Sequence, residues 1–193
     1  MTSAGFSVAE ERVYLRIKWE PRGAGYERLL RAITPHVRTG SLVFTQPEHV
    51  WQSIPFLAAL RCLGCTERIV QRWPANGSFS RYPSVPHSLL VEFDWQAALP
   101  LLLRARRQMY GWCFENPPED LDAYDADGRA VLVTMSHERL GWLDLPAIAV
   151  GPVRNAVRGV VALPRLARSA DEPGQQAPAS LWRESAHEPT GAT

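Results

Sequence analysis

The chain has 193 residues, of which 46% are hydrophobic and 21% charged, the composition of an ordinary globular domain. Its net charge of +1 argues against a nucleic-acid binder, and no apolar run reaches the roughly 18 residues that a membrane helix needs. The first five residues lack the basic and apolar regions of a signal peptide, and three cysteines, an odd number, do not indicate a disulfide framework. We therefore expect a cytoplasmic protein that contacts neither nucleic acid nor a membrane.

The first third of the chain alternates strand and helix patterns. Residues 12–19 alternate apolar and polar side chains, which predicts a strand with one buried face. The spacing i, i+3, i+4, i+7 then predicts an amphipathic helix that ends near Pro35, with an apolar side made of Tyr26, Leu29, Leu30 and Ile33. A short strand is expected at 41–44. A capping box of Thr45 and Glu48 predicts the start of a second helix, which Gly64 would end.

The middle of the chain is less regular. A strand is expected from Glu67 to Trp73, a long loop at 74–87 and a further strand at 89–93. Asp94 is well placed to cap the next element, and we expect a helix over 99–109 with Pro100 in its first turn.

A hairpin is the clearest feature of the last third. Two apolar runs, 121–126 and 130–136, flank Asp127-Gly128, a strong signal for a tight turn between antiparallel strands. Ser136 is expected to cap a short helix that runs to Leu145, and 153–163 to form a strand or an irregular segment. From residue 164 the composition predicts a disordered tail.

Cys62-Leu63-Gly64-Cys65 is a CxxC motif at the predicted end of a helix. A redox pair needs its first thiol at a helix N-terminus, where the dipole stabilises a thiolate, and a zinc site needs a second pair of ligands. Only Cys113 is left for such a pair. We therefore interpret both residues as ordinary, partly buried cysteines.

His137-Glu138 follows the second hairpin strand. A histidine that titrates near neutrality beside a glutamate allows general acid–base catalysis, in which Ser136 could take part. The alternative is a pair that holds the hairpin to the next element or contacts a partner. We favour the second interpretation, because no nucleophile elbow, phosphate-binding loop or dinucleotide motif accompanies the pair.

Six acidic residues lie between 115 and 127 with no basic residue among them: Glu115, Glu119, Asp120, Asp122, Asp125 and Asp127. The spacing fails the calcium-loop pattern, because the position that needs glycine is Asp125. One interpretation is a solvated hairpin edge whose charge prevents aggregation, and the other is a docking surface for a basic protein. Asp120 could instead brace the loop by accepting backbone N–H bonds. The seven tryptophans are expected mostly in the core, although an exposed one would anchor a partner well.

The same region carries a resemblance to a known family. Asn116-Pro117-Pro118-Glu119-Asp120-Leu121, followed by Tyr124, Asp127-Gly128, a run from Val131 to Thr134 and Ser136-His137-Glu138, resembles small bacterial immunity-type proteins found with polymorphic toxins. The resemblance covers about 30 of the 193 residues. It implies a single-domain α+β inhibitor that binds a cognate toxin and has no catalytic activity.

Taken together, the sequence predicts one α+β domain over residues 8–163, with a mixed or mostly antiparallel sheet packed by three or four helices, and a disordered tail over 164–193. The leading functional hypothesis is an immunity protein that binds a protein partner, a basic toxin domain, without cofactor or metal. Its partner-binding residues would be Glu115, Glu119, Asp120, Asp122, Asp125, His137 and Glu138. The alternatives are a small enzyme built around His137 and Glu138, and a structural component of a phage or secretion apparatus.

Overall fold

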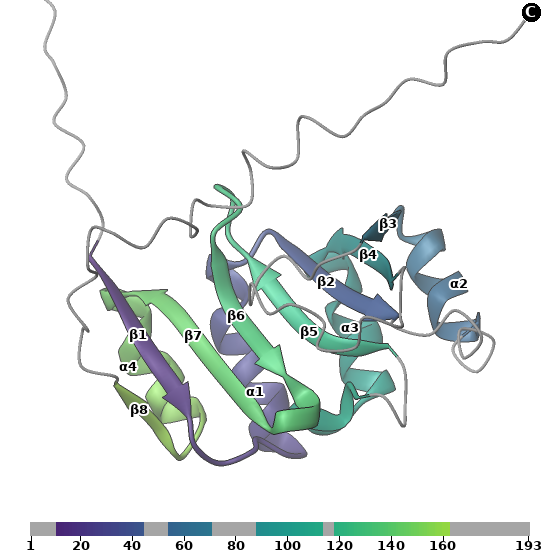
Figure 1. Cartoon of the computed structure of the whole chain (residues 1–193). Coiled ribbons are helices and arrows are strands. Elements are labelled where there is room, and N and C mark those ends of the chain that lie inside the picture. Colours follow the sequence, from purple (N-terminus) through teal and green to yellow (C-terminus); the bar gives the residue numbers. More distant parts are fainter. Residues whose placement is uncertain (1–10, 45–53, 71–87, 114–117, 163–193) are drawn as a thin grey trace, which may run out of the picture.

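The chain forms an open sheet of eight strands in a computed structural model that describes residues 11–44, 54–70, 88–113 and 118–162. The strands are β1 (Arg12–Ile17), β2 (Thr39–Phe44), β3 (Thr66–Val70), β4 (Ser88–Asp94), β5 (Glu119–Tyr124), β6 (Ala130–Met135), β7 (Leu140–Pro146) and β8 (Val160–Ala162). They pair in the order β3-β4-β2-β5-β6-β7-β1-β8, and every neighbouring pair is antiparallel (Figure 1). The predicted α+β class with a mostly antiparallel sheet is confirmed.

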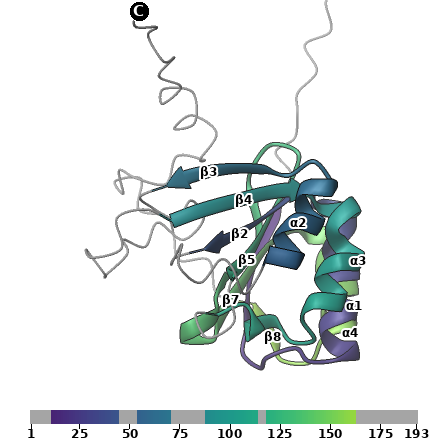
Figure 2. The ribbon, with the colours of Figure 1, turned by 90° about the vertical axis from the view of Figure 1, so that its right-hand side faces the viewer.

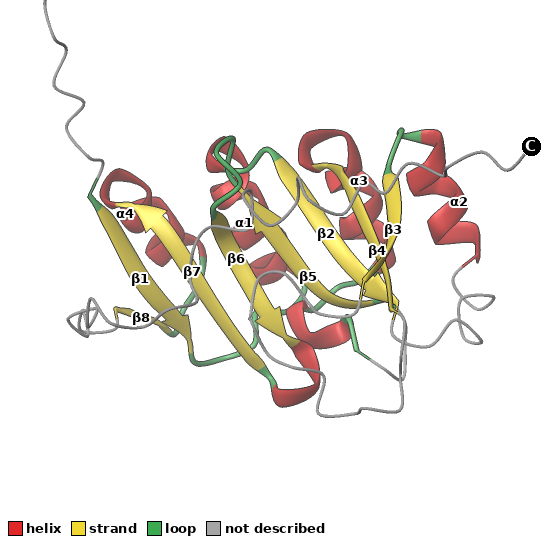
Figure 3. Ribbon diagram, turned by 45° about the horizontal axis from the view of Figure 1, so that its top comes forward, coloured by secondary structure: helices red, strands yellow, loops and turns green. Residues whose placement is uncertain are grey.

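Four α-helices lie against one face of this sheet, as Figures 2 and 3 show. They are α1 (Ala24–Ile33), α2 (Ile54–Cys62), α3 (Trp95–Ala105) and α4 (Ala147–Ala156). Three short 3₁₀ turns, η1 (Thr34–His36), η3 (Met109–Gly111) and η4 (Ser136–Glu138), connect the longer elements. Because all the described helices lie on the same side, each strand has one face toward the helices and one face away from them.

The core fills the space between the helices and the sheet. The helix α1 buries the four apolar residues that its spacing predicted, and they belong to the same core cluster as Leu15 and Ile17 of β1. Two buried indoles find hydrogen-bond acceptors: Trp112 donates to the Tyr26 hydroxyl at 3.0 Å, and Trp95 to the Thr34 hydroxyl at 2.9 Å. These two indole rings are therefore buried without an unpaired N–H group, which would destabilise the fold.

The hairpin at Asp127-Gly128 is confirmed, since β5 and β6 pair antiparallel across that turn. Gly128 has a φ of 76°, a left-handed conformation that costs a glycine little. Asp94 also caps a helix as predicted, because its carboxylate accepts the Ala97 N–H at 2.9 Å. That helix, α3, begins at Trp95 rather than at Leu99, so Pro100 lies inside it and not in its first turn.

The predicted helix from Ser136 to Leu145 is wrong. Only the single turn η4 forms, Arg139 adopts a left-handed φ of 52°, and the chain continues as β7. The strand forms because alternate residues of 140–146 face the core, and Leu143 lies opposite both Leu132 of β6 and Leu15 of β1.

The expectation for 153–163 is correct only at its end. Residues 147–156 form α4, which contains Gly151 and Pro152, and only Val160–Ala162 form a strand. Tertiary packing of Ala149 and Val153 against the sheet offsets the low helix propensity of Gly151 and Pro152.

Several predictions fall outside the described residues. These are the capping box at Thr45 and Glu48, the end of the strand at 71–73, the loop at 74–87 and the tail at 164–193. Within the described part, β3 starts at Thr66, and Gly64 follows the end of α2 with a left-handed φ of 79°.

Candidate functional site

The structure separates the residues that were predicted to bind a partner. Glu119, Asp120 and Asp122 belong to β5 in the middle of the sheet and are only 5%, 2% and 5% exposed. The prediction that these charges lie on an exposed hairpin edge is therefore wrong for all three. Glu115 lies outside the described residues.

Two of these buried carboxylates, on β5, accept hydrogen bonds from the backbone at β6 and just after it. Backbone pairing of β5 with β6 reaches only from Tyr124 to Ala123. Beyond that point, Asp122 accepts the N–H of Thr134 at 2.9 Å, and Asp120 accepts the N–H of Ser136 at 2.6 Å. The carboxylate oxygens thus serve as acceptors where a regular ladder would use main-chain carbonyls.

The backbone of Asp120 explains why the ladder opens. Its φ of 46° is a left-handed conformation that turns this end of β5 away from a regular strand, and its own N–H donates to the carbonyl of Trp112 at 3.0 Å. As suggested, the Asp120 side chain accepts a backbone N–H, but this bond comes from Ser136 and joins β5 to η4, and residues 114–117 of the preceding loop lie outside the described residues.

Burial changes the acidity of both groups. It raises the pKa of Asp120 to about 7, and the charge of the neighbouring Glu119 acts in the same direction. Burial, with a smaller effect of the Asp120 charge, also raises the pKa of Asp122 well above its usual value. Burial therefore favours the neutral acid form of both groups, with Asp120 about half protonated at pH 7. Because both side chains are buried, neither can steer a basic partner.

Asp125 lies at the other end of β5, in the hairpin turn. One of its oxygens accepts the N–H groups of Asp127 and Arg129, and the other accepts from Arg12 at 2.9 Å. Arg12 also donates to the carboxylate of Asp144 at 3.0 Å. The arginine thus joins the hairpin turn to β7, and Asp125 has a structural partner.

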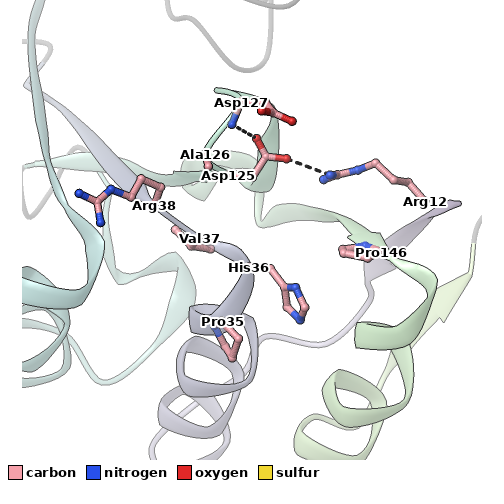
Figure 4. Close-up of a pocket in the computed structure, with 9 residues that line it drawn as sticks. All are labelled: Arg12, Pro35, His36, Val37, Arg38, Asp125, Ala126, Asp127 and Pro146. Atoms are coloured by element: carbon pink, nitrogen blue, oxygen red, sulfur yellow. Dashed lines mark hydrogen bonds and ion pairs between the residues drawn. The ribbon is translucent and has the colours of Figure 1, made fainter. Parts of the chain in front are cut away.

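A pocket of about 380 Å³ adjoins this ion pair (Figure 4). It is lined by Arg12, Pro35, His36, Val37, Arg38, Asp125, Ala126, Asp127 and Pro146. Its wall combines cationic and acidic groups, and its main charged contact is the bond between Arg12 and Asp125. The pocket contains neither His137 nor Glu138.

His137 and Glu138 lie in η4, at the opposite end of β6 from the hairpin turn. Both are exposed, with 3.6 Å between the His137 Nε2 and a Glu138 oxygen. Ser136 beside them is buried, and its hydroxyl has no hydrogen-bond partner among the described residues. The pocket in Figure 4 therefore includes none of the three residues of the enzyme hypothesis.

The CxxC motif lies where the sequence predicts it, at the end of α2. Cys62 is exposed and Cys65 is partly buried. Burial raises the pKa of Cys65, and the nearby Glu67 carboxylate raises it further. This environment disfavours the thiolate that a redox pair needs.

A partly exposed surface that we did not predict from the sequence lies on the side of the sheet away from the helices, and we call it the open face. It comprises the residues of β1, β6, β7 and β8 that alternate with the core positions: Tyr14, Arg16, Val133, Met135, Leu140, Trp142 and Val161. Of these, Tyr14 is 42% exposed, and Trp142 is partly exposed opposite Arg16. In Figure 1 these strands face the viewer, with the helices behind them.

The open face combines apolar area with positive charge. Arg16 and the following Lys18 are exposed, whereas the only carboxylate that β7 contributes, Asp144, is bound by Arg12. The signal was visible in the sequence, because Tyr14 stands among the polar residues of the alternating β1 pattern. An aromatic residue at a solvent-facing strand position is a candidate contact residue.

No protein-family model, curated protein or solved structure matches the chain. Among the described residues, no helix is long and apolar enough to cross a membrane.

Proposed function

We propose that the protein is a binding protein that neutralises a cognate toxin by direct contact, with the open face as its docking surface. The observation that carries the proposal is the exposed Tyr14 on a sheet face that has no described helix over it, beside Trp142 and Arg16. Tyrosine, tryptophan and arginine are the residue types that contribute most binding energy in protein interfaces.

The partner surface should differ from the one expected from the sequence. The basic partner was inferred from a run of acids of which the described members are buried or ion-paired in the fold. Arg16 and Lys18 instead fit carboxylates on the partner, around an apolar centre that covers Tyr14. Cytoplasmic location belongs to the same proposal, and the three free thiols are consistent with a reducing compartment.

The test uses the product of the neighbouring coding region in the native genome. This product is expressed in a bacterial host alone and together with the full chain, and growth is measured. We expect growth arrest that the chain relieves, and a purified complex whose dissociation constant is measured by calorimetry. Tyr14→Ala should weaken binding about 30-fold, which corresponds to about 2 kcal/mol for a central interface residue.

The matched control is Ile148→Ala in the first turn of α4. Ile148 is 81% exposed, but it lies on a helix and outside the open face. Its variant should bind like the wild type. Growth arrest that the chain does not relieve, or equal weakening by both variants, would contradict the proposal.

A further inference from the structure

One end of the sheet is formed by the short strand β3. It pairs with β4 on one side, and no described strand pairs with its other side. An edge strand presents backbone N–H and C=O groups to solvent, which makes it a template for pairing with a further strand.

Exposed apolar side chains gather at this end of the molecule. Ile69 of β3 is 62% exposed, the highest value for a strand residue among the exposed large hydrophobic residues. Ile54 at the start of α2 and Leu63 just after its end are also exposed, and α2 lies beside β3 in Figures 1 and 3. Ile69 faces the helix side, because it lies opposite Leu89, which packs against the core.

Most natural edge strands are protected by charge, by proline or by a covering element. In β3 the charged residues Glu67 and Arg68 are both engaged within the chain. Glu67 pairs with Arg61 of α2, and Arg68 lies 2.9 Å from a carboxylate oxygen of Glu92 on β4. The β3 edge therefore carries balanced charges and no net repulsion toward a copy of itself.

We propose that the protein forms a two-fold symmetric homodimer in which β3 pairs antiparallel with β3 of a second copy. A two-fold axis perpendicular to the sheet keeps both sets of helices on one side, so the two α2 helices flank the new strand pair. The axis passes midway between the two copies of Ile69, which places the isoleucines opposite each other and Arg68 opposite Val70. An axis midway between the two copies of Arg68 would instead place two arginines opposite each other, which destabilises a strand pair.

This geometry explains the apolar character of the edge. The pairing buries Ile69 of both copies between the two α2 helices and gives the outward backbone groups of β3 hydrogen-bond partners. An interface of one strand and one helix per copy lies near the lower end of the stable range, about 1,200 Å² in total. We therefore expect association at micromolar rather than nanomolar concentration.

The test is sedimentation of the full chain over a concentration series, with Ile69→Lys as the variant and Ile148→Lys as the matched control. Both substitutions replace an exposed isoleucine with lysine, but Ile148 lies on α4, which packs against the other end of the sheet. We expect a dimer for the wild type and for Ile148→Lys, and at least about a tenfold weaker association for Ile69→Lys. Circular dichroism checks the fold of each variant. If Ile69→Lys does not fold, Ile69→Thr replaces it, because threonine is favourable in strands.

Hydrogen exchange of the wild type supplies the second measurement. The β3 amides should gain protection as the concentration rises, whereas the amides of β8, at the other edge, should not. A chain that is monomeric at every concentration would overturn the proposal. This result would also be found if a different protein, rather than a second copy, pairs with β3. A dimer that Ile69→Lys leaves intact, or protection at β8 instead of β3, would also overturn it. None of these results depends on the open face, so this proposal and the toxin-binding proposal fail separately.

Discussion

Two buried carboxylates of β5 stabilise this fold as hydrogen-bond acceptors and not as surface charges. Asp120 and Asp122 accept backbone N–H groups from β6, and both have raised pKa values because they are buried. A neutral carboxylic acid still has an acceptor oxygen, so the strand pairing does not require a negative charge. Protonation of these groups therefore favours the folded state.

This environment predicts that the free energy of unfolding depends on pH. The pKa of Asp120 is about 7 in the folded protein and lies near 3.8 without burial. Its stabilising effect is therefore fully present below about pH 4 and is lost as the pH rises toward 7, by at most about 1.4 kcal/mol per pH unit. Denaturant titrations between pH 4 and pH 7 measure this slope. Asp120→Asn should reduce this slope to the share that Asp122 contributes, and Asp127→Asn, in the exposed hairpin turn, should leave it unchanged.

The acceptor role of Asp122 predicts different effects for two substitutions. Asp122→Leu removes the acceptor of the buried Thr134 N–H and should lower the free energy of unfolding by about 1–3 kcal/mol. Asp122→Asn keeps a carbonyl oxygen in the same place and should cost less. Chemical denaturation of both variants near neutral pH checks the order. A larger loss for the asparagine variant would show that the acidic proton, rather than the acceptor, is what β6 requires.

At the scale of the elements, close contact between strands decides where glycine is needed. A Cβ added to Gly40 on β2 would lie 2.5 Å from a ring atom of Phe93 on β4 and 2.9 Å from the ring of Trp95. Because both rings are buried, we expect Gly40→Ala to lower the free energy of unfolding by about 1–3 kcal/mol. Gly151→Ala in α4 is the matched control, since an added Cβ there has no neighbour within 4 Å. The control should leave stability unchanged or raise it by up to about 1 kcal/mol, as thermal unfolding can measure.

The elements that sequence patterns predicted well have a clear period or turn signal. The strand at β1, the helix α1 and the β5–β6 hairpin were all predicted, because their local preferences agree with the fold. The strand β7 was not predicted because Ser136 resembles a helix cap. The pairing of β7 with β6 and β1 is what makes these residues a strand. α4 was missed because Gly151 and Pro152 lower its intrinsic helix propensity, and only the packing of α4 against the sheet makes it a helix.

The candidate site was less predictable than the fold. A dense run of acids indicates solvent exposure, and nothing local in the sequence shows that the β5–β6 ladder opens to admit two carboxylates. The open face could have been predicted in part, since Tyr14 stands on the polar side of β1. Its extent depends on the pairing of β1 with β7 and β8, which only the three-dimensional structure establishes.

At the scale of the whole molecule, the side of the sheet away from the helices has two different halves. Around β2, β4 and β5 it contains the buried residues Ser41, Leu90 and Asp122, whereas around β1 and β7 it is partly exposed. The proposed docking surface occupies the second half, and the proposed dimer contact lies at the far edge beyond the first. One molecule can therefore engage a copy of itself at β3 and a partner at the open face at the same time.

The strand order also determines how the molecule responds to force. The first and last described strands are neighbours, and Leu15 of β1 lies opposite Ala162 of β8, so residues 12 and 162 emerge at the same end of the pair. Tension applied between these residues pulls the two strands apart sideways, and their cross-strand bonds then break one after another instead of sharing the load. A protease or translocase that pulls on the chain beyond residue 162 would meet little mechanical resistance at β8, because that strand pairs through three residues only.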